Sequence, residues 1–404
     1  MKTIEDLNVE NKKVIIRCDF NVPMKDGVIT SDARIVAALE TIQYCLDRGA
    51  KVILMSHLGK VKAETAEKDM AKNNLAPVAK RLSELLGREV TFVNQTRGEE
   101  LENAVAAMQS GDVVLMQNTR YEDANGKKES KNDDELAKYW AELGEVFIND
   151  AFGTTHREHA SNYGITKYLP SAFGKLVEKE VSKLQELTNP EHPFIAVLGG
   201  SKVEDKISVI ENLAPKADKI LIGGGMAFTF LKAAGIEVGN SLVDEKNLDF
   251  CKRMIEEYGD KIVLPIDVAT GKIIDGDVRV TTDYAEKAIT DIASDEMGLD
   301  IGPRTEALFE QYLSTAAIGV WNGPLGVYEN EDYKKNTDKL LKHIVDNQIK
   351  VILGGGDIVA AAGKYKDSVY HASTGGGATL EFIGGTSPLL KVICQGENGK
   401  VFSK

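Results

Sequence analysis

The residues with the clearest chemical potential lie in the run FIAVLGGSKVEDKI at 194–207. An apolar strand is predicted to end at two glycines, and Lys202 and Lys206 follow, four residues apart, at the start of a predicted helix. Backbone N–H groups at a helix N-terminus attract phosphate, and two ammonium groups on one helical face add to that attraction. Similar turns occur in proteins that bind no phosphate, so this run alone leaves both interpretations open.

Two later glycine-rich turns, GGGMAF at 223–228 and GGGD at 354–357, strengthen the phosphate hypothesis. Without a Cβ, the backbone can approach a ligand closely. Asp357 is placed either to bind Mg²⁺ on a nucleotide phosphate or to act as an ordinary helix cap. Asn322 and Glu329 stand at another polar strand end, where a carboxylate could hold ribose hydroxyls. The second half of the chain is thus a candidate nucleotide site.

Basic side chains in the first half follow several predicted strands. Ligands of open α/β sheets bind beyond the carboxyl ends of the strands, so residues at these ends can meet. Forked guanidinium groups there would suit a small polyanion. Each residue alone could be a surface charge, and His57, His156 and His159 could instead bind a metal, although the neighbouring arginines disfavour a cation. The residues that carry the anion hypothesis are Arg34, His57, Arg120 and Arg157.

Short apolar runs alternate along the chain with segments of helical periodicity. Strands that are apolar on both faces and alternate with helices predict parallel sheets covered on both sides. Ten such runs are too many for one ordinary sheet, so we expect two doubly wound, Rossmann-like α/β domains. The runs lie at 13–17, 51–56, 89–93, 112–117, 145–150, 194–200, 219–225, 261–267, 317–323 and 350–356.

The boundary between the two predicted domains lies after Pro170. The segment SAFGKLVEKEVSKLQEL has the pattern of one long helix, and TNPEHP follows it. We therefore expect an N-terminal domain over 1–170, an interdomain helix over 171–188 and a C-terminal domain over 189–389.

Composition and charge narrow the classes of function. The formal net charge of −13 argues against nucleic-acid and anionic-membrane partners, because both require a broad basic surface. The four cysteines show no CxxC spacing, and no apolar stretch reaches the length of a membrane span, so a cytoplasmic location is expected. The charged segment 121–134 is interpreted as a solvated surface loop.

An anion site in one half and a nucleotide site in the other would suit the transfer of a phosphoryl group. The P-loop pattern and the protein-kinase HRD and DFG motifs are missing, and the glycine turns carry no GxGxxG fingerprint. The residues therefore favour a small-molecule phosphotransferase. A nicotinamide-dependent oxidoreductase and a catalytically silent binding protein are the alternatives.

Longer motifs are spread along the whole chain. They are RCDFNVP (17–23), SHLGK (56–60), NTRYE (118–122), NDAFGTTHREHAS (149–161), VLGGSKVEDKI (197–207), GGGMAFTF (223–230), GLDIGP (298–303), WNGPLGVYE (321–329), GGGD (354–357) and STGGGA (373–378). In type and order they resemble the phosphoglycerate kinase family. The resemblance implies reversible phosphoryl transfer from 1,3-bisphosphoglycerate to MgADP, giving 3-phosphoglycerate and MgATP, in glycolysis. It also implies a monomer whose domains close about a hinge.

The resemblance assigns roles to individual residues. Arg34 and Lys202 match the groups that act on the phosphoryl group in transit, and Asp357 matches the magnesium ligand. The positions that match the phosphoglycerate site are Asp19, Phe20, Asn21, Arg34, His57, Leu58, Gly59, Lys60, Arg120 and Arg157. Those that match the nucleotide site are Lys206, Gly223, Gly224, Leu299, Asn322, Glu329, Gly354, Gly355, Gly356 and Asp357.

The chain departs from the family pattern at three places. Lys60 stands where many members have arginine, and Ile358 stands where a Ser or Thr hydroxyl is usual. The C-terminal tail lacks the usual Glu-Gly-Lys and Leu-Pro-Gly elements. The resemblance implies that this tail, at about 390–404, packs on the N-terminal domain.

Overall fold

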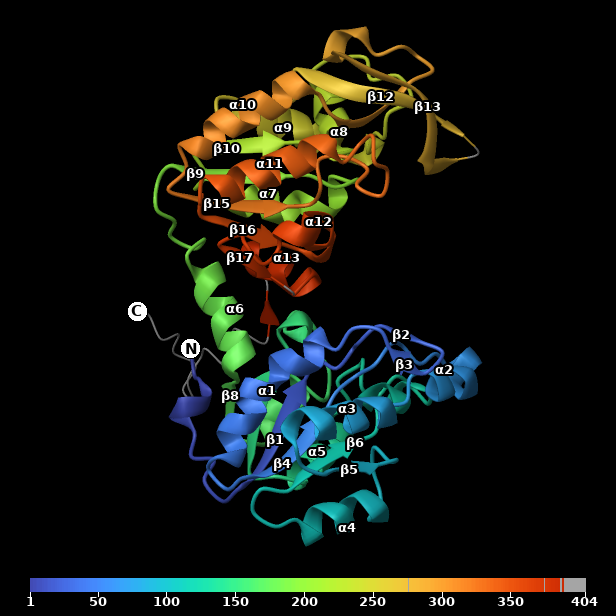
Figure 1. The fold of residues 1–404 in the computed structure, drawn as a ribbon, viewed down its shortest axis with the longest axis vertical. Coiled ribbons are helices and arrows are strands. Elements are labelled where there is room, and N and C mark those ends of the chain that lie inside the picture. The colour runs from blue at the N-terminus through green and yellow to red at the C-terminus, as the bar shows by residue number, and fades with distance from the viewer. Residues whose placement is uncertain (275, 374, 386, 389–404) are drawn as a thin grey trace. The chain divides into compact units, whose positions relative to one another are not determined.

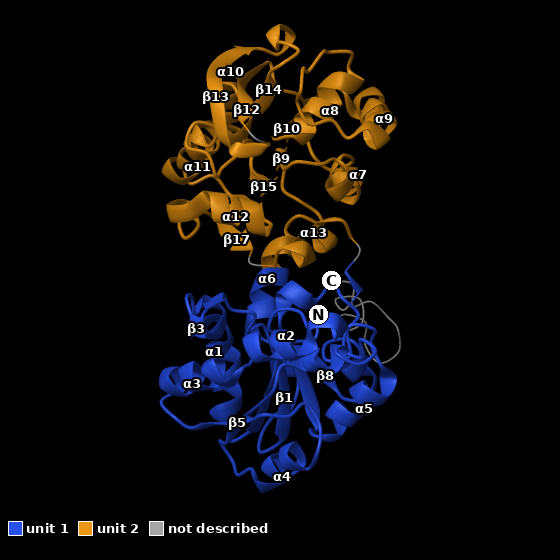
Figure 2. Ribbon diagram, turned by 90° about the vertical axis from the view of Figure 1, so that its right-hand side faces the viewer, with its two compact units in different colours: residues 1–181, 387–404 blue, residues 182–386 orange. Residues whose placement is uncertain are grey.

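The structure is a computed structural model that describes residues 1–274, 276–373, 375–385 and 387–388. It divides into two compact units (Figure 2). Unit 1 comprises Met1–Val181 and the described residues from Ser387 onward, and unit 2 comprises Ser182–Thr386. The tail predicted to pack at about 390–404 lies outside the described residues.

Unit 1 is built on a six-stranded parallel sheet in the order β5-β6-β4-β1-β7-β8 (Figure 1). Its central strands are buried on both faces, in agreement with their apolar sequences, and Ile15 of β1 pairs with Ile53 of β4. The strands are β1 (Lys13–Cys18), β4 (Lys51–Met55), β5 (Val90–Val93), β6 (Val113–Met116), β7 (Val146–Asp150) and β8 (Ser171–Phe173), and a small hairpin joins β2 (Met24–Lys25) to β3 (Val28–Ile29).

Helices cover both faces of this sheet. Alternate residues of β1 point to opposite faces, so Ile16 packs with the helices of one face and Ile15 with those of the other. The first face carries α1 (Ala33–Leu46) and α3 (Ala76–Leu86), and the second carries α4 (Glu99–Ala107) and α5 (Asp134–Glu142); α2 (Ala66–Lys72) precedes α3.

The prediction of a single helix over 171–188 is wrong at its N-terminal end. Ser171–Phe173 form the edge strand β8, and helix α6 runs over Lys175–Gln185. Gly174 separates the two, because a Cβ there would lie 2.3 Å from Asp150 Oδ1. Asp150 Oδ1 accepts the N–H of Leu176 at 2.9 Å, which satisfies a donor in the first turn of α6. The chain therefore finishes the sheet before it begins the helix.

Unit 2 repeats this design with the order β11-β10-β9-β15-β16-β17, again all parallel. In Figure 2, α10 and α11 lie on one side of the sheet and α7 and α8 on the other. The strands are β9 (Phe194–Leu198), β10 (Lys219–Ile222), β11 (Ile262–Val263), β15 (Ile318–Asn322), β16 (Val351–Gly354) and β17 (His371–Ser373). The helices are α7 (Ile207–Leu213), α8 (Met226–Ala233), α9 (Leu248–Tyr258), α10 (Pro303–Ser314), α11 (Lys335–Asp346), α12 (Gly356–Ala362) and α13 (Gly377–Ile383).

The two doubly wound domains expected from the sequence are confirmed, with one addition. A three-stranded antiparallel sheet, β13-β12-β14, lies in unit 2, formed by β12 (Asp267–Ile274), β13 (Asp277–Ala288) and β14 (Met297–Ile301). The run 261–267, predicted as one strand, is divided between the two sheets: β11 ends at Val263, Pro265 follows, and β12 begins at Asp267. A proline cannot donate a ladder hydrogen bond, which explains the break.

Candidate functional site

Unit 1 contains a cavity of about 470 Å³ beyond the carboxyl ends of its strands. Lys60 follows β4, Arg120 follows β6, and Arg157 follows β7, so three of the predicted basic residues meet at one edge of one sheet. The remaining lining residues are Val61, Lys62, Ala63, Glu64, Asp123, Lys127, Ser130 and His159. Lys62 and Lys127 were not predicted as lining residues, because they lie among other charged residues in loops and carry no distinguishing pattern.

Asn118 holds two of the loops around this cavity together. Its Oδ1 accepts the N–H groups of Leu58 and Arg120 at 3.1 and 3.0 Å, and its Nδ2 donates to the Leu58 carbonyl at 2.7 Å. The loop after β4 is thereby fixed to the 3₁₀ helix Thr119–Asp123 after β6. The side chain of Leu58 is itself buried in the core.

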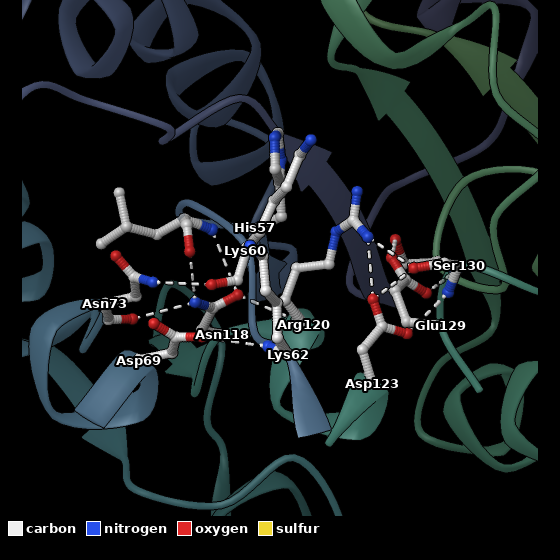
Figure 3. A network of polar contacts seen from close by, with 12 residues as sticks. His57, Lys60, Lys62, Asp69, Asn73, Asn118, Arg120, Asp123, Glu129 and Ser130 are labelled. Carbon is white, nitrogen blue, oxygen red and sulfur yellow. Dashed lines mark hydrogen bonds and ion pairs between the residues drawn. The ribbon is translucent and has the colours of Figure 1, made fainter. Parts of the chain in front are cut away.

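Arg120 is a buried guanidinium held from one side. Its Nη1 donates to Asp123 Oδ2 at 2.8 Å and to Ser130 Oγ at 2.5 Å, as Figure 3 shows. Its Nε is buried and has no hydrogen-bond partner among the described residues. A buried donor without a partner is costly, and an anion in the cavity could satisfy it.

The loop after β1 contributes a second group of predicted residues. Arg34, near the start of α1, forms an ion pair with Asp19. Asn21 Oδ1 accepts the N–H of Gly59 at 2.8 Å, which joins this loop to the loop after β4. The Phe20 side chain is fully buried, and its N–H donates to Ser56 Oγ at 2.8 Å. Phe20 therefore supports the loop from the core.

His57 is buried and does not line this cavity; it lies beside Arg17, whose Nη2 is 3.2 Å from His57 Nδ1. Burial, followed by the charges of Arg17 and Arg120, holds the pKa of His57 well below its ordinary value. The same causes, with Arg120 the larger charge effect, lower the pKa of His159 to about 3. Both imidazoles are neutral at pH 7, so the positive charge of this site comes from its arginines and lysines.

The histidine metal hypothesis finds no support in this geometry. Arg157 Nε donates to His156 Nε2 at 3.2 Å, and Arg17 Nη2 donates to His57 Nδ1 at 3.2 Å. Each of these two imidazole nitrogens therefore already accepts a hydrogen bond from an arginine. Over the described residues, no group of three His, Cys, Asp or Glu side chains is arranged to hold a metal ion.

The charged segment 121–134 is not the solvated loop that its composition predicts. Glu122, Asp123 and Glu129 are all buried. Glu122 accepts from Arg97 Nε at 2.9 Å and Asp123 accepts from Arg120, so the acids face inward to pair with arginines. In the sequence, a buried charge is indicated by Arg17, which stands within the apolar run that forms β1.

In unit 2, three glycine turns are hydrogen-bonded to one another at the carboxyl ends of β9, β10 and β15. Gly199 N–H donates to the Asn322 carbonyl at 2.8 Å, Gly200 N–H to Pro324 at 2.9 Å, and Gly224 N–H to Leu325 at 3.0 Å. A Cβ on Gly224 would lie 2.6 Å from the Gly200 nitrogen. Only glycine fits at such a separation, since real Cβ atoms do not approach backbone so closely.

These turns form part of a second cavity, of about 280 Å³. It brings together four of the predicted nucleotide residues: Gly224, Leu299, Glu329 and Asp357. Gly200, Ser201, Gly225, Leu242, Val278, Met297, Gly298, Pro324, Gly326, Val327 and Tyr328 complete the lining. Val278 and Leu299 come from the antiparallel sheet that the sequence analysis did not predict.

The charged residues of unit 2 lie around the same turns. A Cβ on Gly200 would be 3.9 Å from Lys206 Nζ, so that ammonium lies against the first turn. Burial lowers the pKa of Lys206, while Asp205 and Asp357 oppose the shift. Lys202 and Asp357 are exposed. A lysine and a carboxylate beside glycine backbone can hold a phosphate and its cation.

The glycine turn after β16, GGGD at 354–357, is held by Asn322, which is buried and donates through Nδ2 to the Gly354 carbonyl. Gly355 has φ +117°, and Gly356 begins α12. Ile358, where a hydroxyl is usual in the resembled family, is completely buried in the core, so its side chain contributes packing. Gly223 has no room for a Cβ, which would lie 2.4 Å from Leu325 Cδ2.

Comparison with known proteins extends over nearly the whole chain. The family model described as phosphoglycerate kinase matches residues 4–386. Phosphoglycerate kinases from Macrococcus caseolyticus and Enterococcus faecalis are each 54% identical, and each alignment covers 97% of this chain and 98% of the relative. The solved phosphoglycerate kinase from Coxiella burnetii is 38% identical with a TM-score of 0.85, and that from Pyrococcus horikoshii is 32% identical with a TM-score of 0.81. Each structural match covers 97% of this chain and 98% of the other.

Proposed function

The chain belongs to the phosphoglycerate kinase family, and from that premise we propose which residues perform the reaction. It is a phosphotransferase of glycolysis that moves a phosphoryl group between 1,3-bisphosphoglycerate and ADP. Residues 1–170 bind the phosphoglycerate, and residues 189–389 bind the nucleotide. The observation that carries this assignment is the contrast between the two cavities, one lined by arginines and lysines and the other by glycine backbone.

In unit 1, Arg120, Arg157 and Lys60 hold the anionic groups of the phosphoglycerate. The orphaned Nε of Arg120 supports this role, because it offers a donor that nothing else satisfies among the described residues. Arg34 and Asp19 form one pair at the loop after β1. Arg34 is proposed to exchange part of that pairing for the oxygens of the phosphoryl group.

In unit 2, the backbone of the glycine turns accepts the nucleotide, with Leu299 against the base and Glu329 on the ribose. Lys206 and Asn322 hold the nucleotide phosphates, and Lys202 neutralises the phosphoryl group in transit. Phosphoryl transfer needs positioning and charge neutralisation more than a strong base, and these residues provide both.

Magnesium is proposed to accompany the nucleotide, with Asp357 as its protein ligand. A carboxylate oxygen is the hard donor that Mg²⁺ prefers, and Mg²⁺ usually binds through one or two carboxylates together with phosphate and water. Asp357 fits, since it is exposed and lines the nucleotide cavity. The bound ion would neutralise charge on the phosphates.

The chain is further proposed to act as a monomer in the cytoplasm. Across the described part of the chain, no helix has the length and apolarity that crossing a bilayer requires. Light scattering after size-exclusion chromatography would measure the mass directly.

The test of the proposed function is release of ADP from MgATP, measured with and without 3-phosphoglycerate. We expect release only when 3-phosphoglycerate is present, and loss of release when EDTA removes the magnesium. Release that ignores 3-phosphoglycerate would contradict the substrate assignment. Folded protein that releases no ADP in either condition would contradict the activity itself.

A further inference from the structure

A chain of buried hydrogen bonds leads from Glu129 to His57, both of which are labelled in Figure 3. Ser161 donates through Oγ to Glu129 Oε1 at 2.5 Å and through its N–H to Oε2 at 2.9 Å. Arg17 Nε donates to the same Ser161 hydroxyl at 2.9 Å, and Arg17 Nη2 reaches His57 Nδ1 at 3.2 Å. Glu129, Ser161 and Arg17 are fully buried.

The donors and acceptors fix the direction of this chain. Ser161 has one hydroxyl proton, which goes to Glu129, so its oxygen can accept from Arg17. A guanidinium group has donors only, so His57 Nδ1 must accept. A neutral imidazole carries one proton, which must then lie on Nε2. The network therefore selects one tautomer of His57.

Electrostatics keep His57 in that neutral form. Arg17 on β1, Arg120 after β6 and Arg157 after β7 are positively charged and disfavour an imidazolium, and the neighbouring His159 is itself neutral. Glu129 faces Arg17 from the opposite side and balances its charge. Removal of one member of a buried charge pair leaves the other uncompensated, so Arg17 depends on Glu129 for its place.

We propose that Glu129 and Ser161 are positioning residues that hold Arg17, and that Arg17 thereby fixes His57 as a neutral donor whose Nε2–H is offered to bound phosphoglycerate. The inference rests on the proposed function, because it takes His57 as part of the phosphoglycerate site. It adds a purpose for the buried segment 121–134, which supplies the carboxylate that anchors the network.

The test is long-range ¹H–¹⁵N correlation spectroscopy of the imidazoles, with resonances assigned by a His57→Gln variant. In the ligand-free wild type we expect the Nε2–H tautomer of His57 from pH 6 to 8. Ser161→Ala and Glu129→Gln should each give a mixture of tautomers. Each should also raise KM for 3-phosphoglycerate about tenfold, the effect of losing one oriented hydrogen bond, with KM for ATP unchanged within twofold.

Glu122→Gln is the matched control. It removes another buried carboxylate of the same segment, but one that holds Arg97, which does not line the cavity. We expect the His57 spectrum and KM for 3-phosphoglycerate to match wild type in this control. Ser161→Ala removes only one oxygen, so it serves as the test if Glu129→Gln does not fold.

An Nδ1–H tautomer in the wild type, or a wild-type His57 spectrum in Ser161→Ala, would overturn the proposal. A 3-phosphoglycerate titration separates this failure from failure of the proposed function. If the tautomer depends on Ser161 as expected but 3-phosphoglycerate leaves the His57 resonances unmoved, the network stands and the substrate assignment falls.

Discussion

The cavities of the two units are lined in opposite ways. In unit 1 the lining consists largely of charged side chains, and Arg120 is held by the Asp123 carboxylate and the Asn118 amide. In unit 2 the lining comes largely from backbone, brought close by turns at Gly199, Gly224 and Gly323 that tolerate no side chain. The same doubly wound sheet therefore supports a site that depends on charge and a site that depends on the absence of Cβ atoms.

This difference reconciles a basic site with an acidic protein. The chain carries a net charge of −13, yet unit 1 concentrates Arg17, Arg120 and Arg157 within one region. Burial and the charge of Arg120 lower the pKa of Arg157, which reflects the cost of gathering these groups. An anionic ligand relieves that repulsion, so affinity in unit 1 should respond to salt more than affinity in unit 2.

The largest expected effect tests the comparison at Lys202, a charged side chain beside the glycine turns of unit 2. Lys202→Met should lower kcat on the order of 10²–10³, because it removes charge stabilisation needed only in the transition state. KM for both substrates should change little. Lys364→Met, at another exposed lysine of unit 2, is the control and should keep full activity. A loss of ADP affinity with kcat unchanged would instead make Lys202 a uniform binding residue.

In unit 1, charge and geometry can be separated at Arg157. Arg157→Met should weaken 3-phosphoglycerate binding by roughly 10–100-fold, as expected for a charge-assisted hydrogen bond. Arg157→Lys should recover only part of that loss, because lysine keeps the charge and lacks the fork. Isothermal titration calorimetry at two salt concentrations would measure both. Full recovery by lysine would show that charge alone sets affinity.

In unit 2, the corresponding test adds a Cβ. Gly224→Ala should weaken ADP binding about tenfold. Its Cβ would press on the backbone of Gly200 after β9 and of Pro324 after β15, which must then move away. Gly235→Ala is matched in backbone strain, with φ +87° against +66°, but its Cβ meets nothing within 4 Å. Both variants should lose about 1–2 kcal/mol of stability from the left-handed conformation. Only Gly224→Ala should lose ADP affinity; equal affinity in both would sink the backbone argument.

A further expected effect concerns stability and pH, and it involves neither ligand affinity nor turnover. Burial raises the pKa of Asp150 to about 7. Because the folded protein binds this proton more tightly than the unfolded chain does, the protonated Asp150 stabilises the fold. This contribution is complete below about pH 4, the pKa in the unfolded chain, and is lost as pH rises through 7. The free energy of unfolding of Asp150→Asn, relative to that of wild type, should therefore increase from pH 5 to pH 8 by on the order of 2–3 kcal/mol.

Urea unfolding followed by the fluorescence of Trp140 would measure this difference in unit 1, in a Trp321→Phe background that silences the tryptophan of unit 2. Glu306, whose pKa burial raises to about 7, titrates in both proteins and cancels in the difference. A pH-independent difference would contradict the assignment of the titration to Asp150.

The parts that the sequence predicted follow from local pattern. Apolar runs such as KVIIR and KVILM form strands because they are buried on both faces, and each glycine turn follows such a strand. The edge strands β8 and β17 were not predicted, since three-residue segments leave no periodicity. The antiparallel hairpin of β12 and β13 was missed as well, because β13 carries many exposed polar residues and β12 has Asp267, Thr270 and Lys272 among its apolar positions.

What the sequence could not show is which charges are buried. Glu129 and Lys127 stand two residues apart in the same charged segment, yet one is fully buried and the other is exposed. The difference depends on Arg17 and Ser161, which are more than thirty residues away along the chain. Long-range pairing of this kind has no local signature.

The buried acids of segment 121–134 also change what a protease would encounter. Lys127, Lys128 and Lys131 make the segment look like an open target for trypsin. Cleavage requires the chain to detach, and detachment would strip Arg97, Arg120 and Arg17 of their counter-charges at once. The rate of cleavage within this segment is therefore a measure of how often the unit 1 cavity opens locally, and a ligand that occupies the cavity should slow it.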